Sequence, residues 1–343
     1  QGIVQAATDL QVTGTDISNI AGVIHAGGAL NISGSSLINQ GGKMSAAGQS
    51  YQLAISGAID NSLDGILTTA GNMAITAAGL NNTSGLIYQQ GDGSLLLQVD
   101  NTLNNNDGTI AAAELTITAD RLNNNTGLIQ GGAMDISTAL LNNNAGTIYQ
   151  QSSAGQLNIS TGSLTNDAGQ ISALADASIS AGQLSNNTGR IESGSTLHLS
   201  GGALNNDSGN LVANNITTQL TGALSNNQGT LFAADTLTIA ADSIDNTLGT
   251  LAANADIQLT AATALTNNQG LLQAAGNLSA SAQHIDNSAG TIQAATAQLN
   301  ARQSINNAAG VISAQTLALS TATLNNSYGV ILATDTSDNS LQL

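Results

Sequence analysis

One motif returns about every twenty residues along the whole chain: an aliphatic residue, Asn, a short gap, Gly, any residue and a second aliphatic residue. Residues 204–211 (LNNDSGNL) and 122–129 (LNNNTGLI) are two copies. The anchoring glycines lie 19 to 23 residues apart, at Gly2, Gly22, Gly42, Gly65, Gly85, Gly108, Gly127, Gly146, Gly169, Gly189, Gly209, Gly229, Gly249, Gly270, Gly290, Gly310 and Gly329. A short, nearly constant period over the full length predicts a solenoid, in which each turn of chain stacks on the next.

Apolar and polar residues alternate after each glycine. The second residue after the glycine is aliphatic, or Met44, in all seventeen copies, and the fourth is Ala in twelve of them. A second alternating stretch follows, as in residues 237–239, and the aliphatic residue that opens the motif forms a third. Three stretches with a two-residue period, separated by Gly, Asn, Asp and Ser, indicate three short strands per repeat and no helix.

We therefore predict an all-β fold, a single-stranded right-handed parallel β-helix of about seventeen coils, with residues 1–343 in one domain. Each strand would pair with its counterpart one coil away, at a spacing of ~4.8 Å. The right hand is expected because connections between parallel strands are overwhelmingly right-handed.

An Asn three residues before the anchor glycine recurs in nearly every coil. Asn tolerates turn geometry, and its amide can bond the identical amide of the next coil. We predict a structural Asn ladder and, for the glycine, a turn position that requires a positive φ. The ladder consists of Asn82, Asn105, Asn124, Asn143, Asn166, Asn186, Asn206, Asn226, Asn246, Asn267, Asn287, Asn307 and Asn326, preceded by Asn19 and Asn39, with Asn61 one position early.

The charge balance limits the partners. Four basic residues stand against 21 acidic ones, and the net charge of −17 disfavours nucleic acid and anionic lipid surfaces. The chain has no Cys, and no apolar run reaches the roughly 18 residues that span a bilayer. We expect no nucleic-acid partner, no direct membrane insertion and no cofactor.

Enzymes with β-helix folds are the alternative to a structural role, because carbohydrate-active chemistry needs paired acids in a groove. Acidic residues recur six or seven positions after the glycine at Asp9, Glu114, Asp176, Asp235, Asp256 and Asp335, but only Asp235 and Asp256 belong to successive coils. The three His residues lie many coils apart. We predict no catalytic residue and no metal site, and we interpret the acids as solvated turn residues.

The third position after the glycine should point outward, because its neighbours on both sides point inward. Three of the five aromatic residues, Tyr88, Tyr149 and Phe232, occupy this position. Exposed rings on a polar surface are natural contact points, so this column is the predicted partner-contact face. The alternative is that each ring packs under an inserted loop of its own coil, because Tyr88 and Tyr149 lie in two of the three coils that have a three-residue insertion.

The repeat, rich in Asn and Gly and poor in aromatic residues over essentially the whole chain, resembles the filamentous-haemagglutinin repeats of Gram-negative two-partner-secretion exoproteins. The resemblance implies a right-handed parallel β-helix that serves as a secreted or cell-surface stalk of an adhesin or a contact-dependent growth inhibition protein. It also implies an outer-membrane two-partner transporter, and a receptor or carbohydrate on a target cell. Because the Asn-Pro motifs of the secretion domain and any terminal toxin domain are missing, the chain is expected to be a fragment of a longer protein.

Overall fold

The computed structural model describes residues 2–48, 50–335 and 341–342. The chain divides into two compact units, Gln1–Ala175 and Asp176–Leu343, called here the N-terminal and C-terminal units. Each unit is a stack of coils built from parallel strands, and the described residues form strands and turns without a helix. The prediction of an all-β parallel β-helix is confirmed, with about seventeen coils in all. The described ranges accordingly hold no helix with the length and apolar character that a membrane crossing requires.

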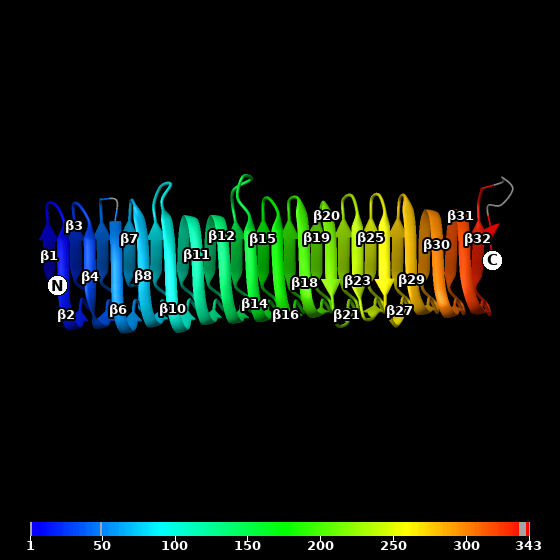
Figure 1. The fold of residues 1–343 in the computed structure, drawn as a ribbon, viewed down its shortest axis with the longest axis horizontal. Helices are drawn as coiled ribbons and strands as arrows, with labels where there is room; N and C mark the ends of the chain where they lie inside the picture. The colour runs from blue at the N-terminus through cyan, green and yellow to red at the C-terminus, as the bar shows by residue number, and fades with distance from the viewer. Residues whose placement is uncertain (1, 49, 336–340, 343) are drawn as a thin grey trace. The chain divides into compact units, whose positions relative to one another are not determined.

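Short strands of about four residues alternate with longer ones in both units, and successive coils lie side by side within each unit (Figure 1). The strands of the N-terminal unit are β1 (Ile3–Ala6), β2 (Leu10–Ser18), β3 (Val23–Ala26), β4 (Leu30–Ile38), β5 (Lys43–Ala46), β6 (Ser50–Asp60), β7 (Ile66–Thr69), β8 (Asn72–Asn81), β9 (Leu86–Gln89), β10 (Ser94–Asn104), β11 (Thr109–Asn123), β12 (Leu128–Asn142), β13 (Thr147–Gln150), β14 (Leu157–Thr165) and β15 (Gln170–Ala173).

The strands of the C-terminal unit are β16 (Ala177–Ser185), β17 (Arg190–Ser193), β18 (Thr196–Asn205), β19 (Asn210–Ala213), β20 (Asn215–Leu220), β21 (Leu224–Ser225), β22 (Thr230–Ala233), β23 (Leu237–Ala241), β24 (Ile244–Asp245), β25 (Thr250–Ala253), β26 (Ile257–Ala261), β27 (Ala264–Thr266), β28 (Leu271–Ala274), β29 (Asn277–Asp286), β30 (Thr291–Asn306), β31 (Val311–Asn325), β32 (Val330–Ala333) and β33 (Leu341–Gln342). In this unit several coils are divided into three short strands, such as β22, β23 and β24.

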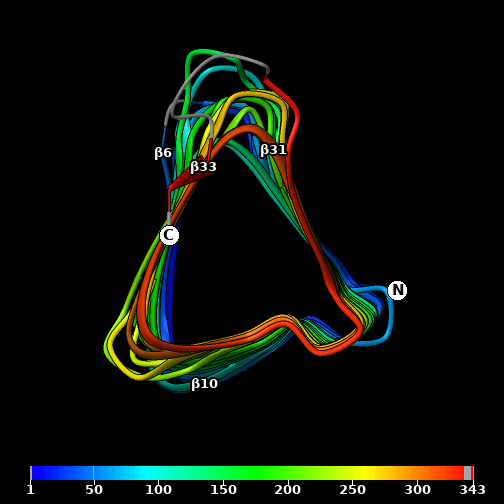
Figure 2. The same ribbon diagram turned by 90° about the vertical axis from the view of Figure 1, so that its right-hand side faces the viewer.

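One coil has three sides, which Figure 2 shows as a triangular outline. In the coil that starts at Gly209, these sides are β19, β20 and β21. Elsewhere the strand continues through the corners, and β11 covers all three sides of its coil in 15 residues. Every strand pairs in parallel register with its equivalent one coil away, as β19 does with β22 through Leu211 and Leu231.

The core consists of one layer of aliphatic side chains per coil. In β19 the buried residues are Leu211 and Ala213, the second and fourth after the glycine, and the residues between them are half-buried. Leu224 and Ile244 represent the third predicted stripe, and both are buried. The alternation predicted from the sequence is therefore confirmed, and small Ala side chains such as Ala213 and Ala233 are buried at the fourth position.

The anchor glycine does not have the positive φ that its recurrence predicts, so this prediction is wrong. The positive φ, between 50° and 65°, belongs to the residue directly before the glycine, for example Ser208, Gln228 and Leu248. The glycine N–H donates to the carbonyl oxygen of the Asn three residues earlier, as Gly209 does to Asn206 at 3.0 Å. A positive φ only at the third residue of such a turn is the pattern of type II.

Close approach of the preceding coil explains why the position is glycine. A Cβ at Gly209 would lie 2.1 Å from the backbone oxygen of Asn186 and 2.6 Å from Oδ1 of Asn206. Both distances are far below van der Waals contact, and the same two kinds of atom crowd the anchor glycines of other coils. The glycine is needed because the stacked turn has no room for a side chain.

Candidate functional site

The Asn column runs through the interior of each unit as a chain of side-chain hydrogen bonds. In the N-terminal unit Nδ2 of Asn82 donates to Oδ1 of Asn105 at 2.7 Å, and Asn105 donates in turn to Asn124 at 2.7 Å. Asn61, one residue early, still takes its place and donates to Asn82 at 2.8 Å. Two consecutive residues with positive φ, Leu63 and Asp64, absorb the extra residue in that turn.

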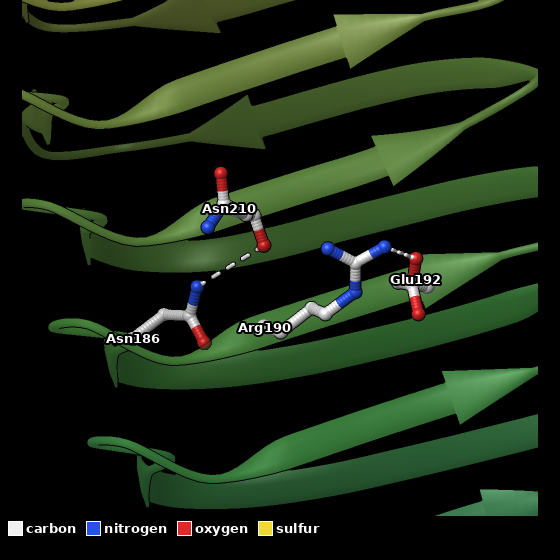
Figure 3. A network of polar contacts seen from close by, with 4 residues as sticks. All are labelled: Asn186, Arg190, Glu192 and Asn210. Atoms are coloured by element: carbon white, nitrogen blue, oxygen red, sulfur yellow. Dashed lines mark hydrogen bonds and ion pairs between the residues drawn. The ribbon is translucent and has the colours of Figure 1, made fainter.

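The C-terminal unit contains the same arrangement. Asn186 donates to Oδ1 of Asn206 at 2.7 Å and to the backbone oxygen of Asn210 in the next coil at 3.5 Å, the second of which Figure 3 shows. Asn206 donates to Asn226 at 2.8 Å and to the carbonyl oxygen of its own Gly209 at 3.1 Å. Each amide thus ties its own turn to the next coil, while its carbonyl oxygen accepts from the coil before.

Three of the six acids in the predicted turn column accept hydrogen bonds from backbone N–H groups. Oδ1 of Asp9 accepts from the backbone N–H of Ala29 at 2.8 Å, Asp176 from Thr196 at 3.0 Å and Asp256 from Asn277 at 2.7 Å. Hydrogen bonds from the Ser195 side chain and the Thr196 backbone hold the pKa of Asp176 below its ordinary value. These carboxylates satisfy donors of the next coil at a corner.

Other charged side chains lie on the outer surface. Arg190 and Glu192 are two residues apart on β17, and their side chains form an ion pair that is visible in Figure 3. Nδ1 of His25 lies 2.9 Å from Oγ of Ser45, and Nδ1 of His284 lies 2.8 Å from Oγ of Ser304, each one coil away. Within the described ranges, no group of three His, Asp or Glu side chains could hold a metal ion.

The predicted partner-contact face lies on the first strand of the coil. Tyr88 is 38% exposed, and Tyr149 and Phe232 are half-buried. Tyr88 is paired with Ala111 and Tyr149 with Gln130, so three coil spacings, about 14 Å, separate the two rings along the N-terminal unit. Phe232 lies in the same column of the C-terminal unit, between Val212 and Ala252.

Two inserted loops directly follow Tyr88 and Tyr149. They join β9 to β10 and β13 to β14, and they are the cyan and green loops at the top of Figure 2. The buried residue beneath each loop is the Gln that follows the Tyr, since Gln89 and Gln150 occupy the inward position that Ala fills in most coils. These two Gln residues are not among the site residues predicted from the sequence, although the inward alternation marks their position.

Both Gln side chains hold the loops by hydrogen bonds. Nε2 of Gln89 donates to the backbone oxygen of Gln90 at 2.6 Å, and its Oε1 accepts from the N–H of Ala113 at 3.3 Å. Nε2 of Gln150 donates to the backbone oxygen of Ser152, and its Oε1 accepts from the N–H of Leu174 at 3.0 Å. Each loop is therefore attached to the coil that follows it.

A surface hollow lies between the two loops, and we call it the notch. The coils between the loops have no insertion, because β11 and β12 pass through the same corner as continuous strands. The notch has a volume of 670 Å³. It is lined by Asp92 of the first loop, residues 151–155 of the second, and Ala113, Glu114, Gly132 and Ala133 of the two strands.

Comparison with known proteins identifies one family. The sequence model described as "Haemagglutinin repeat" matches residues 1–62, 50–96, 91–166, 152–219, 208–269, 258–303 and 294–341. These overlapping segments cover nearly the whole chain. No curated protein and no solved structure matches the chain.

Proposed function

Because this chain belongs to the haemagglutinin repeat family, we propose that it is a non-catalytic stalk segment of a secreted or cell-surface filamentous exoprotein. The observation that carries the proposal is the uniformity of the coils. Within each unit, the same layer of aliphatic side chains and the same Asn amide connect one turn to the next. A structure in which each coil contacts mainly its neighbours extends in one direction as repeats are added.

The finer parts of the function follow from the family and are proposals about the parent protein. We propose that an outer-membrane transporter of the two-partner type exports it to the surface of a Gram-negative cell. The stalk would project a distal binding or toxin module, and it would meet a receptor or carbohydrate on a target cell. The parent would be an adhesin or a contact-dependent growth inhibition protein.

The chemistry of the notch also fits a non-catalytic role. The notch has two acids, Asp92 and Glu114, and no Lys, Arg or His among its lining residues. Cleavage of a glycosidic bond by two carboxylates requires one of them to stay protonated while the other is ionised. Both side chains are exposed to solvent.

Small-angle scattering tests the stalk directly. We propose that each added coil lengthens the stack of its unit by ~4.8 Å. A variant that lacks residues 230–270, two whole coils, should be shorter by about 10 Å with the same cross-section. A compact particle, or a particle whose length does not change with the deletion, would refute the stalk.

A further inference from the structure

The two inserted loops are not needed to close a coil. The strands between them, β11 and β12, turn the same corner without any insertion and still pair in full register, from Thr109 with Leu128 to Asn123 with Asn142. A loop that the fold does not require, held on a rigid scaffold, is the usual carrier of binding residues. The two loops are therefore candidates for a binding function.

Buried residues beneath the walls of the notch hold the two loops in place by hydrogen bonds. Gln89 and Gln150 are buried, and their amides bond the loop backbone on one side and the following coil on the other. The floor is made by short side chains, Ala113 and Ala133, and by Gly132. Ordering the walls on binding would therefore cost little conformational entropy, which favours binding.

The lining determines which chemistry fits. Asp92 and Glu114 accept hydrogen bonds, and Gln151, Ser152 and Ser153 both donate and accept them. The negative charge disfavours anionic ligands. An extended peptide cannot add to the floor as a strand, because β11 and β12 already pair on both sides with neighbouring coils.

The two tyrosines lie on the strands that lead into the walls, Tyr88 on β9 and Tyr149 on β13. Tyr88 lies four residues before Asp92 of the first wall, and Tyr149 lies two residues before Gln151 of the second. The two tyrosines are about 14 Å apart along the stack. Gln130, between them in the same column, is hydrogen-bonded to Gln151 of the second wall. Aromatic rings supply flat apolar area next to a row of hydroxyl, amide and carboxylate groups.

We propose that the notch is a binding site for an uncharged oligosaccharide that lies along the stacking direction, with its hydroxyls on Asp92, Glu114 and Gln151 and a ring face on Tyr88 or Tyr149. The volume of 670 Å³ lies within the range of about 300–1,000 Å³ that small-ligand sites occupy. This inference deepens the adhesive part of the proposed function and rests on it, because it supplies the stalk with a ligand of its own.

The test is binding of the full chain to labelled chitohexaose, cellohexaose and maltohexaose, with hexagalacturonate and hexalysine as charged comparisons. The variant Ala113→Trp would fill the notch. Its matched control is Ala295→Trp, which changes the equivalent corner residue of β30, also a continuous strand of 16 residues. Asp92→Asn combined with Glu114→Gln removes both charges at exposed positions and gives a second variant that keeps side-chain size.

We expect at least one neutral hexasaccharide to bind, with affinity reduced about tenfold or more, equivalent to 1.4 kcal/mol, by Ala113→Trp and by the double variant but not by Ala295→Trp. Hexagalacturonate should not bind. Absence of binding by all neutral sugars, binding unaffected by both notch variants, or binding of hexalysine alone would overturn the proposal. None of these outcomes changes the length measured by scattering, so the stalk and the sugar site can fail separately.

Discussion

Asn206 donates its side-chain amide to Oδ1 of Asn226 at 2.8 Å, and neither side chain is exposed to solvent. The same nitrogen donates to the carbonyl oxygen of Gly209, and Oδ1 of Asn206 accepts from Asn186. A buried amide with its groups satisfied stabilises the fold, whereas its removal leaves its partners without hydrogen bonds in a site that water does not reach. The Asn column should for this reason tolerate substitution poorly.

Asn206→Ala should lower the free energy of unfolding by about 1–3 kcal/mol, because the amides of Asn186 and Asn226 each lose a partner. Hydrogen exchange should show the damage confined to the neighbouring coils, since each coil contacts mainly the next. Asn210→Ala, at an outward position of the same coil, is the control and should change stability by less than about 0.5 kcal/mol. If Asn206→Ala kept full stability and lost binding to a partner, the column would be functional rather than structural.

Gly249→Ala should destabilise the chain by about 3 kcal/mol, because a Cβ there would lie 2.1 Å from the backbone oxygen of Asn226. Gly249→Asn distinguishes the two explanations for the glycine, since Asn tolerates a positive φ but still adds a side chain. We expect Asn to be no better than Ala in urea denaturation. Gly79→Ala, whose Cβ would meet nothing closer than 3.8 Å, should be nearly neutral.

Leu248→Asn should stabilise the chain by about 1 kcal/mol. Leu248 has a φ of 57°, a conformation that costs most residues about 1–2 kcal/mol and Asn less. Its side chain is 51% exposed, so little packing is lost with it. Leu174→Asn is the matched control, because Leu174 is 49% exposed and is absent from the residues with positive φ. Equal effects of the two substitutions on the thermal midpoint would contradict relief of backbone strain.

Tyr51→Phe should raise stability at alkaline pH. The Tyr51 hydroxyl is fully buried without a hydrogen-bond partner, and burial raises the pKa of the phenol above its ordinary value of 10.0. The folded chain therefore keeps the proton at a pH where the unfolded chain releases it. The stability linked to this group is fully present below pH 10 and is lost as the pH rises above it.

The measurement is urea denaturation of both proteins at several pH values. The advantage of Tyr51→Phe should grow by up to about 1.4 kcal/mol per pH unit above pH 10, as far as the fold survives. Because the other tyrosines are present in both proteins, the difference isolates Tyr51. A constant difference across the alkaline range would show that the phenol ionises equally in the folded and unfolded chain.

Changing Tyr88, Tyr149 and Phe232 together to Ser should weaken association with a partner while the thermal midpoint stays within a few degrees of the parent. The three side chains point outward, and the most exposed of them, Tyr88, is open to solvent over 38% of its surface. Association would be measured by retention on target cells or by sedimentation of the chain itself. Lower stability with unchanged association would assign the rings to packing alone.

Much of this fold could be read from residue order, because the features that specify it are local and repeated. The inward positions of Leu211 and Ala213 follow from alternation on a pleated strand, which holds whatever lies one coil away. The parallel stacking follows from the period itself. Likewise, an Asn recurs at one position next to an apolar stripe, and this recurrence predicts that Asn206 lies in the interior.

The predictions that failed or were incomplete concern contacts between one coil and the next. Whether Gly209 is needed for its φ or for its missing side chain depends on how close the backbone oxygen of Asn186 comes. Gln150 is buried at a position where most coils have Ala. Its Oε1 accepts a hydrogen bond from the N–H of Leu174, which lies 24 residues later in the chain. Neither the close approach of Asn186 nor the hydrogen bond from Leu174 can be inferred from the order of residues.

The sequence by itself determined the period, the strands, the inward stripes and the Asn column, since each is a property of a single coil that repetition makes unmistakable. Only the tertiary structure decided which turn residue takes the positive φ, why the glycine has no side chain, and that two loops three coils apart enclose a notch over Ala113 and Gly132. The physical reason is that these features arise from atoms brought together by stacking. The distances between these atoms are set by the packing of one coil against its neighbour and not by spacing along the chain.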